Sequence, residues 1–158
     1  MSSKKPFEKL GSFDAIHLGL VSDLISVDDS TVWSCSHDRR ILVWDSKGTN
    51  ISKIAELNAH SSKVNCLVQT SKNVWSCSSD KSLLVWDKYT RKLVKDIPNA
   101  HEDSVLCGNS FNDTVYTGSA SLCKTLRSWF INESREDSFI SDESSVMGLT
   151  SPRKEIDI

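Results

Sequence analysis

The chain has 158 residues, 38% of them hydrophobic, and a formal net charge of −2. This is the size of one domain or of a piece of a larger one, and the near-neutral charge gives no basic field for general nucleic-acid binding. No apolar run approaches the roughly 20 residues of a membrane span, and the start, residues 1–6, has no apolar stretch of a signal peptide behind it. A cytoplasmic location is therefore expected, with the nucleus as the alternative.

The first predicted element is a strand over residues 7–13, after a disordered start at 1–6. Its apolar residues precede His17 with the spacing that the apolar residues of 53–57 keep before His60. Because 53–57 closes a repeat further along the chain, 7–13 is predicted to be an outermost strand of the same kind.

Three histidines, His17, His60 and His101, then mark a period of about 42 residues. Each is followed by a short apolar strand, a turn of polar residues and a second strand rich in β-branched and aromatic residues. Trp33 and Trp75 belong to these second strands, where packing between strands is favoured over a stacking platform for a ligand.

The third strands carry the tripeptide Val-Trp-Asp, at residues 43–45 and again at 85–87. Residues 34–45 align with 76–87 over their whole length, and fourth strands follow at 53–57 and 92–97. No window shows a sustained period of 3.6 residues, so helix fits poorly. Four short strands per period predict an all-β fold.

These repeats resemble those of WD-repeat β-propellers over about residues 7–130. The resemblance implies a partial β-propeller of about three four-stranded antiparallel blades, with repeats at about 17–57, 60–97 and 101–130 and a disordered C-terminal tail. In that family a His, a Ser or Thr, an Asp and a Trp of each repeat form a hydrogen-bonded set. Carried over, the set comprises His17, Ser34, Asp38, Trp44, His60, Ser76, Asp80, Trp86, His101, Thr117 and Trp129.

The third repeat departs from the pattern. Ser121 stands where the Asp is expected, Phe130 replaces the Asp after the Trp, and the turn is one residue longer. An incomplete polar set is therefore predicted, and this blade is expected to be the least stable of the three.

A His, a Ser and an Asp in one repeat also suggest a nucleophilic triad. However, the trio recurs in each of the first two repeats, which an active site would not do, and each Trp needs an acceptor for its indole N–H. No glycine-rich phosphate loop or metal-ligand spacing accompanies it. We therefore expect no catalytic residue, no cofactor and no metal.

Four cysteines lie among strand residues and are predicted to be buried free thiols, since no zinc or C-x-x-C spacing occurs. They are Cys35, Cys66, Cys77 and Cys107.

Three blades are too few for a closed ring from one chain, because propellers typically have four to eight. An open row would expose two terminal blade faces, and large apolar patches rarely stay bare. Two hypotheses remain open. Two chains could pair into a six-bladed ring, residues 7–13 of one completing the third blade of the other, or the chain is a fragment of a longer propeller protein.

Residues 131–158 are acidic, serine-rich and poor in apolar residues, which predicts a disordered tail. The alternative is that residues 138–140 add a weak fourth strand to the third blade. Ser151 precedes a Pro-Arg-Lys sequence and resembles a site of proline-directed kinases, which makes it a candidate phosphosite.

The leading functional hypothesis is a non-catalytic scaffold or adaptor for protein–protein interaction. In the family, the loops beside the His and the turn Asp lie on one face that commonly receives peptides. The candidate contact residues are His37, Arg39, Arg40, Ser61, Ser62, Lys63, Ser79 and Lys81. Their basic character favours an acidic or phosphorylated peptide. The alternative is a regulatory propeller segment of a multidomain signalling enzyme, such as a phosphoinositide phosphatase or a guanine-nucleotide exchange factor.

Overall fold

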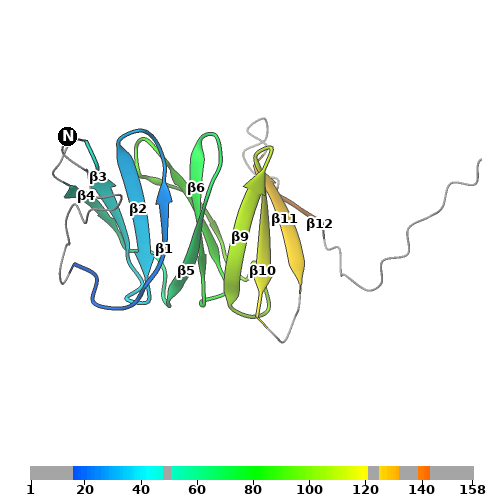
Figure 1. Cartoon of the computed structure of the whole chain (residues 1–158). Coiled ribbons are helices and arrows are strands. Elements are labelled where there is room, and N and C mark those ends of the chain that lie inside the picture. Colours follow the sequence, from blue (N-terminus) through cyan, green and yellow to red (C-terminus); the bar gives the residue numbers. More distant parts are fainter. Residues whose placement is uncertain (1–15, 48–50, 121–124, 132–138, 143–158) are drawn as a thin grey trace, which may run out of the picture.

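The structure, a computed structural model, describes residues 16–47, 51–120, 125–131 and 139–142. They form three four-stranded antiparallel sheets, each built from strands that follow one another in the chain. The sheets stand side by side as blades, with the first and third at the two ends of the row (Figure 1). This confirms the predicted fold class. Among the described residues there is no helix that could cross a membrane.

The strands of each blade are short and joined by tight turns. Blade 1 contains β1 (Val21–Ser26), β2 (Thr31–Ser36), β3 (Ile41–Asp45) and β4 (Ser52–Leu57). Blade 2 contains β5 (Val64–Gln69), β6 (Asn73–Ser78), β7 (Leu83–Asp87) and β8 (Leu93–Ile97). Blade 3 contains β9 (Val105–Phe111), β10 (Thr114–Ser119), β11 (Leu126–Ile131) and β12 (Phe139–Asp142).

The register of the second and third strands is the same in all three blades. Val32 lies opposite Trp44, Val74 opposite Trp86, and Val115 opposite Trp129. Successive side chains of a strand point to opposite faces. Equivalent residues of the three blades therefore face the same way along the row.

The core lies between the blades. One cluster joins blade 1 residues such as Trp33 and Val43 to Val64, Leu67 and Trp86 of blade 2. A second cluster joins blade 2 residues, among them Trp75, to residues of blade 3. Trp33 and Trp75 are 0% and 1% exposed, so both indoles pack between blades and could not stack on a ligand.

The third blade has a fourth strand of its own. Strand β12 pairs with β11, with Phe139 opposite Ile131 and Asp142 opposite Ser128. The prediction of a tail without structure from residue 131 onward was therefore wrong for these residues, and the alternative of a fourth strand near 138–140 describes them better. The predicted strand at 7–13, the rest of the tail and Ser151 lie outside the described residues.

The cysteine prediction holds for three of the four thiols. Cys35, Cys66 and Cys77 are buried, whereas Cys107 is exposed. Cys107 occupies the position in blade 3 that Cys66 has in blade 2. Cys66 is covered by the next blade, but no described residue packs over Cys107. Burial raises the pKa of Cys35 to about 12, and hydrogen bonding with Cys66 together with burial raises that of Cys77.

Candidate functional site: the loop face of the blades

A chain of hydrogen bonds crosses the second blade beneath its loops. The indole Nε1–H of Trp86 donates to Ser76 Oγ at 3.0 Å, and Ser76 Oγ lies 2.7 Å from His60 Nε2. His60 Nδ1 lies 2.9 Å from Asp80 Oδ2. If Ser76 donates to His60 and His60 donates to Asp80, every group is satisfied with a neutral imidazole.

Blade 1 repeats this arrangement. Trp44 donates to Ser34 Oγ at 2.9 Å, and Ser34 Oγ lies 2.9 Å from His17 Nε2. His17 Nδ1 lies 3.0 Å from Asp38 Oδ2. The structure thus brings together the residues that the resemblance assigned to one set in each of the first two repeats.

The turn carboxylates also fix the loops that precede each blade. Asp38 accepts the backbone N–H of Leu18 at 2.8 Å, and Asp80 accepts that of Ser61 at 2.9 Å. Each carboxylate therefore ties two loops of the same face to one another. This preorganises the face, because an ordered loop loses less conformational entropy when it binds a partner.

Blade 3 has the same chain of hydrogen bonds from Trp through a hydroxyl to His, here called the relay, but the partner of its His is different. Trp129 donates to Thr117 Oγ1 at 2.7 Å, and Thr117 Oγ1 lies 2.7 Å from His101 Nε2. His101 Nδ1 then meets Thr125 Oγ1 at 3.0 Å. Ser121, at the expected Asp position, lies outside the described residues. The hydroxyl of Thr125 supplies the acceptor that a carboxylate supplies in the other blades.

The sequence analysis missed Thr125 and its equivalent Ser82, and it assigned Arg40, the equivalent in blade 1, to partner contact. Ser82 precedes β7 in the same way, donating to Asp80 at 2.6 Å and lying 3.2 Å from His60 Nδ1. Arg40 precedes β3 and binds Asp38 through Nε and Nη2, at 3.1 and 2.9 Å. The signal was present: each repeat has a hydrogen-bonding side chain immediately before its third strand.

Burial and hydrogen bonding set the charge states of these groups. Burial alone would raise the pKa of Asp80, but bonds from Ser82 and the neighbouring His60 outweigh it and lower that pKa to about 2. Asp38 behaves likewise, and its pKa lies well below the usual range because backbone and side-chain donors outweigh burial. Burial lowers the pKa of His60, and burial with the nearby Arg127 lowers that of His101 to about 4.

The repeated geometry is that of a structural set. The hydroxyl residues are buried, Ser76 and Thr117 at 0% exposure and Ser34 at 5%. No substrate atom could reach Ser76 or Thr117 without separating two blades, whereas Ser34 lines a cavity on the outer face of blade 1. Among the described residues, no group of three or more acidic, His or Cys side chains is placed to hold a metal ion.

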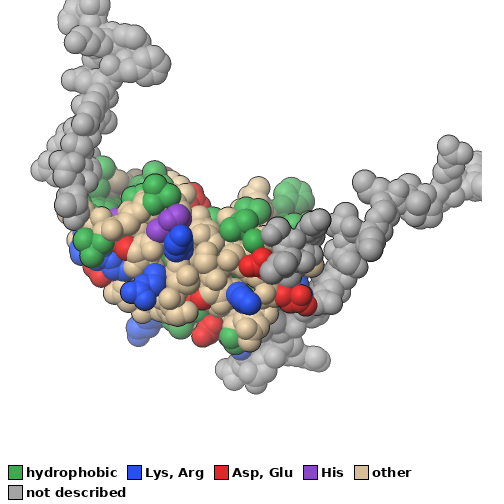
Figure 2. Space-filling view, turned by 90° about the horizontal axis from the view of Figure 1, so that it is seen from below, with side chains coloured by type: hydrophobic (Ala, Val, Ile, Leu, Met, Phe, Trp, Pro, Cys, Tyr) green, Lys and Arg blue, Asp and Glu red, His purple; other side chains and the backbone are tan. Residues whose placement is uncertain are grey.

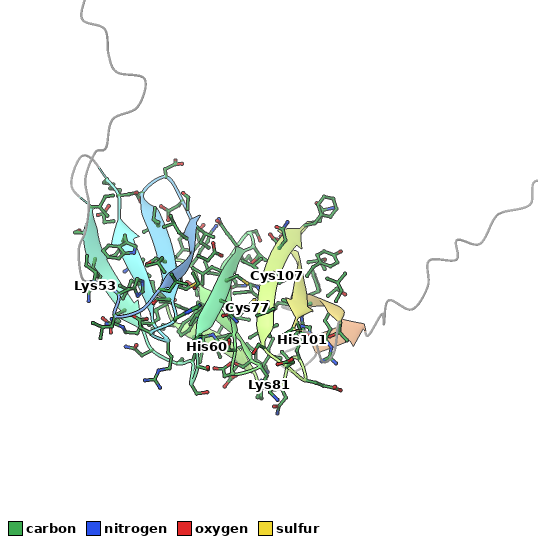
Figure 3. All side chains as sticks on the ribbon, turned by 60° about the horizontal axis from the view of Figure 1, so that its bottom comes forward. Lys53, His60, Cys77, Lys81, His101 and Cys107 are labelled. Atoms are coloured by element: carbon green, nitrogen blue, oxygen red, sulfur yellow. The ribbon has the colours of Figure 1, made fainter. Side chains whose placement is uncertain are left out.

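Most predicted contact residues lie on the loops above this set. His60, His101 and Lys81 lie toward the same end of the strands (Figure 3). Viewed from that end, Lys and Arg side chains are spread over the face, with Asp and Glu side chains between them (Figure 2). Arg39, Ser61, Lys63 and Lys81 are exposed, and His37, Ser62 and Ser79 are half-buried.

Arg39 and Lys81 occupy the same position in consecutive blades. Both have left-handed backbones, with φ of 74° and 73°, a conformation that costs a non-glycine residue roughly 1–2 kcal/mol. The turn N–H groups of Arg39 and Lys81 bond to the carbonyls of Ser36 and Ser78 at 3.1 and 3.2 Å. The turn thus holds each basic side chain outward, and within the described part of the chain neither side chain has a hydrogen-bonding partner.

Arg40 differs from the other predicted contacts because it is used inside the molecule. Besides Asp38, it binds Glu56 at 3.3 Å and the carbonyl oxygen of Ile16 at 3.2 Å. Its guanidinium therefore belongs to the polar set of blade 1 and is not a free anchor for a ligand. Ser79 is also engaged, since its Oγ accepts Asn65 Nδ2 at 3.0 Å.

One described loop of blade 3 on this face is acidic. Glu102 and Asp103 follow His101, where Ser61 and Ser62 follow His60 in blade 2. An acidic ligand would therefore be attracted to blades 1 and 2 and repelled by the corresponding loop of blade 3.

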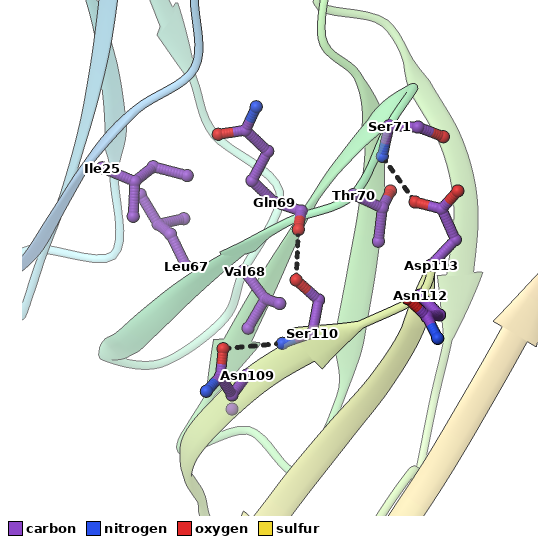
Figure 4. Close-up of a pocket in the computed structure, with 11 residues that line it drawn as sticks. Ile25, Leu67, Val68, Gln69, Thr70, Ser71, Asn109, Ser110, Asn112 and Asp113 are labelled. Carbon is purple, nitrogen blue, oxygen red and sulfur yellow. Dashed lines mark hydrogen bonds between the residues drawn. The ribbon is translucent and has the colours of Figure 1, made fainter.

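Away from the loop face, a hollow with a volume of about 640 Å³ lies where β5 and β9 meet (Figure 4). Its polar groups are largely bonded to one another. Ser110 Oγ donates to the carbonyl oxygen of Gln69 at 2.6 Å, and the backbone N–H of Ser71 donates to Asp113 at 2.7 Å. These bonds join blades 2 and 3, and they leave few polar groups free to converge on a ligand.

The three sheets, with their shared register and repeated relay, define a segment of a β-propeller. The family model described as WD domain, G-beta repeat matches residues 51–87. A search of curated proteins finds no match. The crystal structure of RRP9 WD40 repeats is similar, with a TM-score of 0.66 and 22% sequence identity over 78% of this chain. The chain therefore has the fold of a β-propeller segment and contains one matched WD repeat, and it spans 38% of the RRP9 chain that it matches.

Proposed function

We propose that the chain is a non-catalytic interaction module whose loop face binds an acidic or phosphorylated peptide on blades 1 and 2. WD-repeat propellers are generally protein-interaction scaffolds. The preference for an acidic peptide is supported by Arg39 and Lys81, which are exposed, unpaired among the described residues and held in the same left-handed turn. Lys63 adds a third exposed cation on the same face.

The carboxylates of this face do not cancel that attraction. Asp38 and Asp80 are engaged by backbone donors and by their histidines, so their lone pairs point into the blade. A peptide phosphate or carboxylate would meet the outward cations first. Such charge-assisted bonds are roughly twice as strong as neutral ones.

The test is a binding titration with fluorescent acidic peptides, each in a phosphorylated and an unphosphorylated form. The double variant Arg39→Glu with Lys81→Glu is expected to weaken binding by roughly 30-fold or more, since each rim charge contributes about 1 kcal/mol or more when reversed. The matched control reverses the charges of Lys47, which follows β3, and Lys92, which precedes β8. Both lysines lie at the ends of the strands away from the loop face. Equal affinity of both double variants for every peptide would refute the proposal.

We further infer that two copies can pair end to end into a six-bladed ring. Each blade already has four strands, so the contact needs no exchange of strands between copies. Support comes from the large exposed apolar side chains on both terminal blades, including Leu24 on blade 1 and Leu126 on blade 3. Light scattering tests this: a ring has twice the 17.6 kDa mass of the chain, and a monomer at all concentrations would refute it.

The role as a regulatory segment of a signalling enzyme and the cytoplasmic location stay predictions. For the first, a longer reading frame that encodes a catalytic domain would be the supporting observation. For the second, imaging of the tagged chain in cells would decide.

A further inference from the structure

The outer face of blade 1 contains an apolar cavity of about 240 Å³. Four of its lining residues, Val21, Leu24, Val32 and Trp44, are here called the terminal socket. Three strands contribute them: β1 supplies Val21 and Leu24, β2 supplies Val32 and β3 supplies Trp44. Val21 and Leu24 are 52% and 62% exposed, so the socket is uncovered by the described residues.

The same socket occurs again inside the molecule, where it is filled. Its equivalents in blade 2 are Val64, Leu67, Val74 and Trp86, which are 0–4% exposed. They share one buried cluster with Trp33 of blade 1.

A third version of the socket, in blade 3, is also filled. It contains Val105, Val115 and Trp129, with Gly108 at the Leu position, and shares a cluster with Trp75 of blade 2. In each case an aromatic ring on the second strand of one blade packs against the aliphatic and indole side chains of the next. The molecule therefore shows twice what kind of side chain fits this socket.

One aromatic ring of this kind has no socket among the described residues. Tyr116 of β10 holds the position of Trp33 and Trp75: its partners across the sheet are Asn109 and Ser128, where Trp75 has Val68 and Val85. Tyr116 is 37% exposed on the outer face of blade 3. Leu126, Phe111 and Phe130 of the same blade are also exposed.

We propose that Tyr116 of one copy fills the terminal socket of a second copy, as Trp33 and Trp75 fill the two internal sockets. This rests on the six-bladed ring proposed above and names the contact that closes it. No Asp, Glu, Lys or Arg lines the cavity: the socket is aliphatic and indole, and the polar residues beside it, His17 and Ser34, are hydrogen-bonded to each other. On the other surface, Tyr116 lies between the uncharged Asn109 and Ser128. Depletion of charge is typical of the core of a protein interface. A second copy of the chain offers the required ring at the required position.

The experiment measures the dissociation constant of the full chain by sedimentation equilibrium. Leu24→Glu is expected to weaken association by roughly 30-fold or more, because the contact would bury an unpaired carboxylate. Tyr116→Ser is expected to weaken it about 10-fold or more through lost apolar area. Tyr116→Trp, which restores the residue of the internal sockets, is expected to tighten it roughly threefold.

Matched controls separate the contact from general effects of the substitutions. Leu93→Glu places the same charge at a leucine that is 45% exposed on β8, and Tyr89→Ser removes a tyrosine that is 67% exposed after β7. Both are expected to associate like the natural chain. Unfolding curves of every variant check that the blades remain folded.

Mixing the two disruptive variants gives a sharper test. The Leu24→Glu chain keeps its Tyr116, and the Tyr116→Ser chain keeps its socket, so a mixed pair retains one of two contacts. Each variant alone is expected to be monomeric at a concentration at which the mixture forms heterodimers. An interface built from two sockets face to face would show no such recovery.

The outcomes distinguish the contact of Tyr116 with the terminal socket from the six-bladed ring itself. Association that is unchanged, within twofold, by Leu24→Glu and Tyr116→Ser would overturn the socket contact and leave the ring standing. A natural chain that stays monomeric would overturn both, while peptide binding by the loop face would still be measured on the monomer. Open polymers sensitive to both substitutions would support the socket contact and overturn the closed ring.

Discussion

The hydroxyl of Ser76 is the centre of the relay in blade 2, and its removal should be costly. Ser76 is fully buried, accepts the indole N–H of Trp86 and lies within hydrogen-bond distance of His60 Nε2. Ser76→Ala removes both bonds and leaves a buried donor and a buried acceptor without partners. An unsatisfied buried group costs about 1–3 kcal/mol, so we expect a loss of roughly 2–4 kcal/mol in the free energy of unfolding.

Urea unfolding followed by tryptophan fluorescence measures this loss. The control is Ser52→Ala, because Ser52 is exposed at the start of β4 and its side chain makes no hydrogen bond within the described residues. A surface change of this kind is expected to stay within about 0.5 kcal/mol. The slope of the free energy against urea should be unchanged in both variants. A loss below about 1 kcal/mol for Ser76→Ala would refute the view that its hydroxyl organises the blade.

Three further predictions concern blade 3 and its junction with blade 2. Thr125→Ala removes the acceptor of His101 Nδ1 and should cost about 1–2 kcal/mol in urea unfolding, whereas Thr125→Ser should restore most of the loss; equal stability of the two variants would contradict the relay. Burial and Arg127 lower the pKa of His101 to about 4 in the folded state. Between about pH 6.5 and pH 4, His101 is therefore protonated in the unfolded state but neutral in the folded state. Stability should therefore fall as the pH falls through that window and be fully present above it, and His101→Gln should flatten the dependence measured by thermal unfolding. Gly108→Ala places a Cβ 2.7 Å from Val68 Cγ2 and should lower the free energy of unfolding by about 1–3 kcal/mol. At Gly118 the close atom is Sγ of the exposed Cys107, which can rotate away. Gly118→Ala should therefore cost clearly less in the same assay.

The polar sets show how a repeat in the sequence can predict a site. His60, Ser76, Asp80 and Trp86 were assigned together because equivalent residues recur at the same offsets, and the structure places them within hydrogen-bond distance. Recurrence is informative here because a fixed strand register turns equal spacing along the chain into equal position in the blade. A single copy of the motif would not have separated a structural set from a catalytic triad.

Local departures from the repeat were harder to predict. The loss of the turn Asp in the third repeat predicted an incomplete set, yet Thr125 takes the place of that Asp as the partner of His101. Arg40 was predicted to contact a ligand, yet it binds Asp38 and Glu56. Both outcomes depend on which side chains reach one another across a turn, and that is decided by distances of a few ångströms that spacing along the chain does not encode.

The sequence by itself determined the number of blades, all their strands except β12, and the direction in which each strand side chain faces, because alternation along a strand and recurrence between repeats are local properties. Only the tertiary structure decided what covers each face. Trp33 and Trp75 are buried by the next blade, whereas the equivalent Tyr116 remains exposed, and Cys107 is exposed where the equivalent Cys66 is buried. The strand β12 likewise forms only because the edge of β11 is there to pair with it. The physical reason is common to all of them: burial and edge pairing depend on neighbours that are distant in the chain.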